Sequence, residues 1–144
     1  PSMTQERMIL DAVNHTDSKV RVNPIIGPED ILSSRRVVDT IYMDDKIKNY
    51  IVSLVYATRD PRGFQLDLHD YIETGASPRA TLFLARAAKA LALVRGRGYV
   101  MPEDVKEIAP DVLRHRIVPT YEAEAEEVSA DDLIARLLAR VEVP

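Results

Sequence analysis

The stretch Gly75-Ala76-Ser77-Pro78-Arg79-Ala80, followed by a run with neither glycine nor proline before Gly96, predicts the start of a long helix. Ser77 is of the residue type that caps a helix N-terminus. Pro78 suits the first helical position, where its missing N–H costs no hydrogen bond. Gly96, with Gly98 two residues later, is typical of a helix end. We therefore expect a helix from Ser77 to about residue 95.

Arg79 is out of place in the first turn of such a helix. A cation there lies against the positive end of the helix dipole, which costs a few tenths of a kcal/mol if nothing compensates. An anion in front of the turn would remove the conflict, because helix-start N–H groups and a guanidinium both bind phosphate well. The local pattern leaves two interpretations open, an arginine that binds a phosphate and an arginine that turns to solvent.

Five blocks of sequence, in a fixed order, carry a family resemblance and cover roughly half of the chain. The blocks are Gly75–Ala80, Arg86–Ala90, Gly96–Val100, Pro102–Val105 and Val112–Ile117. Together they resemble the C-terminal lid of MoxR-type AAA+ ATPases.

The resemblance implies a role for the odd arginine. In this family the Gly-Ala-Ser-Pro-Arg block contains the sensor 2 arginine, which touches the terminal phosphate of the nucleotide, and by position that residue is Arg79. The resemblance thus implies that Arg79 is the catalytic residue and that Ser77, Pro78 and Arg79 bind the nucleotide.

The family's ATPase core precedes the lid, and its motifs are not found in this sequence. None of the five glycines lies in a G-x-x-x-x-G-K-[ST] phosphate loop. Asp44-Asp45 stands at a predicted helix start, so we interpret it as a cap rather than a Mg²⁺ site. By resemblance, residues 1–40 are the tail of the ATPase core and residues 41–144 are the lid. ATP and Mg²⁺ would then be bound mainly by the upstream core, and the isolated chain should be inactive as an ATPase.

Composition excludes several classes of protein. A net charge of −4 argues against a nucleic-acid binder or an anionic-membrane binder. The chain has no cysteine, which excludes disulfides, thiolate metal sites and cysteine nucleophiles. No two of His15, His69 and His115 have the spacing of metal ligands on one helix face, so we expect no metal site. No apolar run is long enough to span a membrane, and we expect a cytoplasmic protein.

The apolar spacing predicts an all-α fold, a small helical bundle with at most a short strand pair. Ser2 and Gln5 have the spacing of a capping box, as do Ser129 and Asp132. The clearest amphipathic face has apolar residues at i, i+3, i+4, i+7 and i+8 from Ile47. The other expected helices run from Met3 to about His15, from Pro28 to about Asp39, from Pro102 to about Leu113, and across Leu133–Val141.

Three segments are expected to be non-helical, and a fourth is expected to be solvated. Val20–Ile26 reads as a strand or an extended linker, and Arg59–Thr74 as a long irregular loop of the kind that is often functional or mobile. Arg116–Tyr121 is β-prone and is predicted as a single strand. The acidic run Glu122–Glu127 is predicted to be solvated.

Several basic residues have two interpretations. Arg79 and Arg86 lie on nearly one helix face, with Lys89 three residues further on, and form either a solvated face or a positive edge for phosphate or a neighbouring subunit. Arg114-His115-Arg116 follows a helix C-terminus, which favours an interaction with the helix dipole over a contact with a partner.

The alanines of the helix that starts at Ser77 favour tight packing within the domain over an intersubunit seam. Loop surface charges are expected at Arg59, Arg62 and Arg97.

The resemblance also implies partners for the whole protein. It would hydrolyse ATP in a homo-oligomeric ring, contacting its own core and neighbouring subunits, and would remodel or mature partner proteins, typically ones with von Willebrand factor A domains. The alternatives are the lid of a magnesium-chelatase-type AAA+ subunit and a non-enzymatic helical interaction module. Helix-turn-helix DNA binding is disfavoured by the acidic charge balance.

Overall fold

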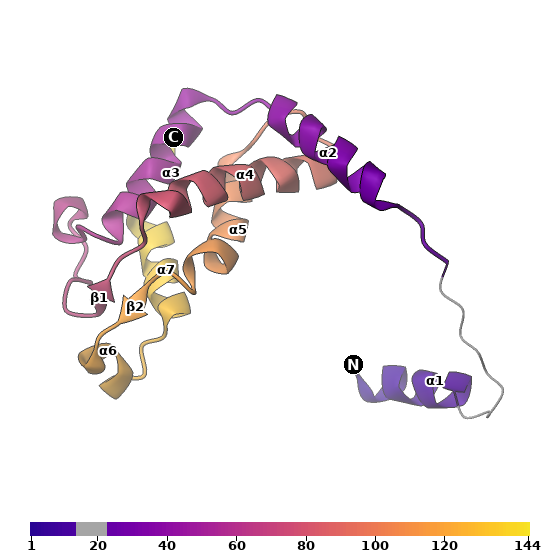
Figure 1. The fold of residues 1–144 in the computed structure, drawn as a ribbon. Helices are drawn as coiled ribbons and strands as arrows, with labels where there is room; N and C mark the ends of the chain where they lie inside the picture. Colours follow the sequence, from indigo (N-terminus) through magenta and orange to yellow (C-terminus); the bar gives the residue numbers. More distant parts are fainter. Residues whose placement is uncertain (14–22) are drawn as a thin grey trace. The chain divides into compact units, whose positions relative to one another are not determined.

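The computed structural model describes residues 1–13 and 23–144 and is mostly helical (Figure 1). Its described residues form seven α-helices, one short 3₁₀ helix and two short strands. The predicted all-α class with at most a strand pair is therefore confirmed. The chain divides into two compact units, Pro1–Leu32 and Ser33–Pro144. No helix in the described ranges is long and apolar enough to cross a membrane.

Two helices begin in the first unit. α1 spans Met3–Val13, and the predicted capping box is present, since the Ser2 N–H donates to Gln5 Oε1 at 2.7 Å. The expected end of α1 at His15 and most of Val20–Ile26 lie outside the described residues, and residues 23–26 form neither helix nor strand. α2 spans Pro28–Thr40, close to its predicted bounds, and ends in the second unit. Neither helix has a buried residue.

α3, Asp45–Ala57, forms as its apolar periodicity predicts. Asp44 is the N-cap and accepts a hydrogen bond from the Lys46 N–H at 2.8 Å, which confirms a capping role for the aspartate pair. The predicted face is the buried one, because its side chains meet the core while the opposite side of the helix stays exposed. The buried members are Ile47, Tyr50, Ile51, Leu54 and Val55.

α4, Pro78–Val94, packs more extensively against α5, Pro102–Leu113, than any other pair of elements packs (Figure 1). The small side chains of Ala80, Ala88 and Ala92 are fully buried, which confirms tight packing within the domain. Gly96 ends α4 with a positive φ of 70°, as a helix-terminating glycine should. Gly98 has no positive φ, and its carbonyl instead accepts the Tyr42 N–H at 2.9 Å.

The long segment before α4 is more ordered than predicted. It contains a 3₁₀ helix, Arg62–Phe64, and a strand, β1, Ile72–Thr74. β1 pairs antiparallel with β2, Val118–Pro119, with Ile72 opposite Pro119. The strand predicted within Arg116–Tyr121 is thus confirmed, and its partner strand was missed.

The C-terminal part carries two helices. α6, Tyr121–Ala125, occupies most of the acidic run, whose glutamates are exposed, so the prediction of a solvated run is confirmed and its short helix was missed. Its glutamates are exposed, but Ala123 is buried and its N–H donates to the capping Thr120 Oγ1 at 3.2 Å. α7, Ala130–Arg140, begins at the predicted Ser129 capping box and buries Leu133, Ile134 and Leu137 in the core.

Candidate functional site

The predicted site residues stand at the start of α4. Ser77 occupies the N-cap position in an extended conformation, and Pro78 takes the first helical position, as predicted. The expected capping bond is absent, because the Ser77 hydroxyl makes no hydrogen bond to the first turn of α4. Ser77, Pro78 and Arg79 are all exposed. The start of α4 therefore presents its first turn to solvent without a side-chain cap.

The segment that leads into α4 is fastened to the end of α3. The Thr58 side chain is fully buried, and its hydroxyl accepts a hydrogen bond from the Ala76 N–H at 2.8 Å. Gly75 lies against the Thr58 backbone so closely that a Cβ added to it would be 2.3 Å from the Thr58 carbonyl oxygen. Only glycine fits there. Sequence reasoning missed Thr58, since no local pattern links it to a helix that starts twenty positions later.

Arg79 is available to an external ligand. Within residues 1–13 and 23–144, no hydrogen bond or ion pair involves its side chain. The first turn of α4 also contains no acidic residue that could offset the cation. The conflict between the guanidinium and the helix dipole is thus uncompensated within the described chain, and an anion in front of the turn would relieve it.

The other basic residues of the predicted positive edge have different surroundings. Arg86 is exposed two helical turns from Arg79 and, with Arg35 of α2, lines a hollow of about 450 Å³. Lys89 donates a hydrogen bond to the Asp39 carbonyl oxygen at 3.2 Å, which joins α4 to the end of α2.

Arg97, predicted as a loop surface charge, is instead part of an ion-pair cluster, so that expectation was wrong. It donates two hydrogen bonds to the fully buried Asp104 carboxylate, one of them from Nη1 to Oδ2 at 2.8 Å. Arg95 contributes further contacts, to Asp104 Oδ1 at 3.3 Å and to Glu107 Oε2 at 2.5 Å. The cluster joins the C-terminal end of α4 to the first turns of α5.

The environment of Asp104 keeps it charged. Burial by itself would raise the pKa of the Asp104 carboxyl group. The hydrogen bonds from Arg97 and from the Met101 N–H outweigh that effect, so the pKa lies below its ordinary value. Sequence reasoning could have found this residue, because an acid three positions after an N-cap commonly accepts a hydrogen bond from the N-cap N–H, as Asp104 does from Met101.

Three further arginines are held by nearby groups. Arg59 places its guanidinium 5.0 Å from the centre of the Tyr56 ring. Arg114 donates to the Asp131 carboxylate at 2.8 Å. Arg116 donates from Nε to the Val112 carbonyl oxygen at 3.0 Å, in the last turn of α5. This last contact agrees with the predicted role at a helix C-terminus.

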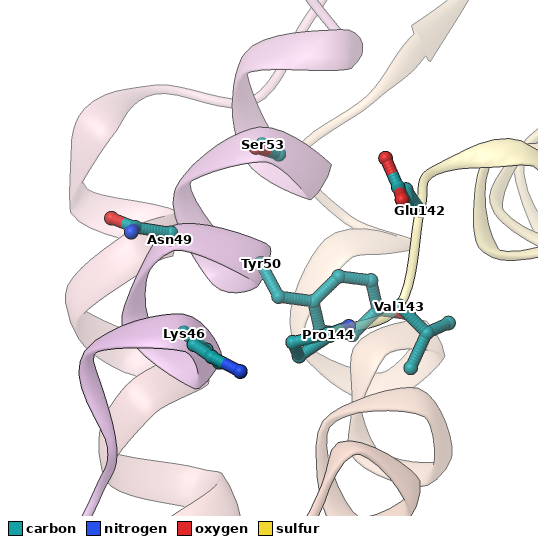
Figure 2. A pocket seen from close by; sticks show the side chains of 7 residues that line it. All are labelled: Lys46, Asn49, Tyr50, Ser53, Glu142, Val143 and Pro144. Atoms are coloured by element: carbon teal, nitrogen blue, oxygen red, sulfur yellow. The ribbon is translucent and has the colours of Figure 1, made fainter.

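A hollow of about 360 Å³ lies elsewhere, between α3 and the last residues of the chain (Figure 2). Lys46, Asn49, Tyr50 and Ser53 line it from α3, opposite Glu142–Pro144. Burial, with the nearby Glu103 charge, raises the pKa of Tyr50, and its buried hydroxyl has no partner among the described residues. None of the predicted site residues lines this hollow.

The half-buried His69 lies between two exposed aspartates in a cluster of potential ligands before β1. Its Nε2 is 2.8 Å from Asp70 Oδ1, an ion pair when the imidazole is protonated. Asp67, His69 and Asp70 bring one ligand atom each to within 4.8 Å of one another.

Comparison with known proteins identifies a family and a solved structure that resemble this chain. The AAA lid domain family matches residues 65–137, a range that contains α4, α5 and Arg79. A solved structure of a candidate ATPase from Cytophaga hutchinsonii is also similar, with a TM-score of 0.93 and 37% identity. The similarity covers 99% of this chain and 44% of that one.

Curated relatives point the same way. Chaperone MoxR1 of Mycobacterium tuberculosis is 40% identical over 100% of this chain and 38% of its own length. The uncharacterized protein YeaC of Bacillus subtilis is 33% identical over 100% of this chain and 42% of its own. Protein MoxR of Methylorubrum extorquens is 33% identical over 72% of this chain and 32% of its own. This chain thus spans less than half the length of these relatives. It belongs to the AAA lid domain family, as the lid of a MoxR-type AAA+ protein.

Proposed function

We propose that this chain is the lid part of a longer AAA+ ATPase, and that Arg79 is its contact with the terminal phosphate of ATP. The observation that carries the proposal is the setting of Arg79. The residue is exposed, has no partner within the described ranges, and lies in the first turn of a helix that has no side-chain cap. An anion is the ligand that this arrangement suits best.

In this proposal residues 1–40 are the tail of the ATPase core and residues 41–144 are the lid. The upstream core would bind ATP and Mg²⁺, and Ser77, Pro78 and Arg79 would approach the phosphates from the lid side. A guanidinium next to the terminal phosphate stabilises the negative charge that develops during hydrolysis. The sequence contains no phosphate loop, so in this proposal the isolated chain would not hydrolyse ATP by itself.

The cycle of hydrolysis would drive changes in partner proteins. A relative is named a chaperone, which supports remodelling or maturation of other proteins as the output. The assembly would be a cytoplasmic homo-oligomeric ring, in which the lid contacts its own core and neighbouring subunits. Proteins with von Willebrand factor A domains are the partner class that the family resemblance suggests.

Substitution of Arg79 in the full-length protein tests the proposal. Arg79→Ala should lower ATP turnover by about two to three orders of magnitude, the range seen when one transition-state donor is lost. Arg79→Lys should restore only part of the rate, because a point charge lacks the guanidinium fork. Phosphate release by assembled protein at saturating ATP is the measurement.

The matched control is Arg62→Ala. Arg62 is exposed, and no contact of its side chain is found in the described structure, so its loss should leave turnover unchanged. Arg95 would be a poor control, because it pairs with Asp104 and Glu107. Wild-type turnover by an Arg79→Ala protein that assembles normally would show that the proposal is wrong.

A further inference from the structure

We propose that Thr58 is a positioning residue for Arg79, setting from the end of α3 the direction in which the arginine leaves α4. This inference rests on the proposed function, since it assigns Thr58 an effect on ATP turnover through Arg79. Thr58 lies twenty-one positions before Arg79 and is fully buried, so it acts through the backbone that carries the arginine and not on the nucleotide.

The Thr58 hydroxyl makes two hydrogen bonds at once. It donates to the Val55 carbonyl oxygen at 2.7 Å, within the last turn of α3, and accepts from the Ala76 N–H at 2.8 Å. Both bonds are buried, where an unpaired polar group is costly. One hydroxyl therefore joins the end of α3 to the backbone three positions before Arg79.

A second contact acts in the same place. A Cβ on Gly75 would lie 2.3 Å from the Thr58 carbonyl oxygen and 2.6 Å from its carbonyl carbon. Contacts this short cannot be accommodated unless one backbone shifts. The absence of a side chain at Gly75 is what allows the two segments to approach, and the Thr58 hydroxyl then fixes their register.

The chain between this contact and Arg79 has little freedom. Pro78 fixes its own φ through its ring, and Ser77 is extended. On the other side of Arg79, Ala80 is fully buried, and its N–H donates to the Ser77 carbonyl oxygen at 2.8 Å. Arg79 is thus held between two fixed backbone points, so its Cα–Cβ direction follows from the position of Ala76.

Thr58→Val in the full-length, assembled protein tests the inference, because valine keeps the shape and removes the hydroxyl. The maximal rate of ATP hydrolysis should fall at least about tenfold with little change in KM. The reason is that a displaced Arg79 would stabilise the transition state less well, while substrate binding would change little. Thr58→Ser keeps the hydroxyl and should retain the wild-type rate. Thr58→Val combined with Arg79→Ala should be no slower than Arg79→Ala alone.

Thr120→Val is the matched control. The Thr120 hydroxyl also donates to a carbonyl, that of Asp70 at 2.6 Å, and accepts from an N–H, that of Ala123 at 3.2 Å. It lies at the start of α6, so its loss should lower thermal stability while leaving the maximal rate unchanged. Equal rate losses in Thr58→Val and Thr120→Val would overturn the inference by showing a general effect of destabilisation.

The double variant separates this inference from the proposed function. If Arg79→Ala is slow while Thr58→Val has the wild-type rate, or the two losses multiply, Thr58 does not act through Arg79 and only the inference fails. A wild-type rate in Arg79→Ala overturns both. Where Thr58→Val does not assemble, Gly75→Ala replaces it, and its rate loss must likewise vanish in the Arg79→Ala background.

Discussion

Asp104 is a charged residue that is fully buried in the described part of the chain. Its buried carboxylate receives hydrogen bonds from Arg97 and from the Met101 N–H. Asp104→Asn should lower the free energy of unfolding at pH 7 by about 2 kcal/mol, as expected for hydrogen bonds to a charged group. Urea unfolding of the isolated chain measures this.

The stability lost in Asp104→Asn should depend on pH in a definite direction. The folded-state pKa of Asp104 is lowered, so its stabilisation is complete above the unfolded-state pKa of about 3.9 and is lost as the pH falls through the folded-state value. The gap between wild type and Asp104→Asn should be constant from pH 7 to pH 5 and shrink below about pH 4. Asp111→Asn, which removes an exposed ion pair with Arg114, is the control and should change little. A gap that widens in acid would contradict this account.

At the scale of single residues, the sequence predicted the positions that residues take in helices better than it predicted which side chains contact one another. Pro78 takes the first helical position as expected, but Ser77 makes no capping bond. Arg97 was expected on the surface and instead pairs with Asp104, and Thr58 was not noticed at all. A side chain's chemistry limits which bonds it can make. The choice among them depends on neighbours that only the folded chain brings near.

At the scale of elements, the two serines that precede α7 and α4 form a natural comparison. Ser129 accepts a hydrogen bond from the Asp132 N–H at 3.2 Å, whereas Ser77 caps nothing. Ser129→Ala should therefore lower the free energy of unfolding by about 1 kcal/mol. Ser77→Ala should change it by a few tenths at most. The measurement is the urea unfolding midpoint of each variant of the isolated chain. Equal losses of stability in Ser129→Ala and Ser77→Ala would contradict the assigned caps.

Helices with several turns were predictable, and the shortest elements were not. α3 and α7 repeat their apolar residues over three turns, and the sequence placed each to within a few residues. α6 has five residues and β1 three, too few for a period to show. β1 also exists only through pairing with β2, more than forty residues away. Such non-local pairing has no local signature.

At the scale of the molecule, stability should be uneven along the chain. α1 and α2 have no buried residue, whereas α4 buries four, so residues 1–40 should open more readily than the rest. In hydrogen exchange the amides of α1 should exchange well before those at the centre of α4. Protection of α1 equal to that of α4 would show that residues 1–40 are an integral part of the stable domain.

The isolated chain should be folded and helical but should release no phosphate from ATP. The sequence contains no phosphate loop, and Asp44, which was weighed as part of a Mg²⁺ site, is a helix cap. A coupled phosphate assay against a buffer blank, with circular dichroism to confirm folding, is the measurement. ATPase activity that rises in proportion to the concentration of this chain and persists after repurification would contradict the proposal that the upstream core binds ATP and Mg²⁺.

The fastening of α4 at both ends has a mechanical consequence. Thr58 holds the segment entering the helix, and Asp104 holds Arg95 and Arg97 at its exit. Seventeen helical residues form a rod of about 25 Å, stiff along its axis. A force applied at Arg79 is therefore not absorbed by a loose joint at either end. If Arg79 contacts a phosphate as proposed, a displacement of Arg79 along the helix axis would be transmitted to the start of α5.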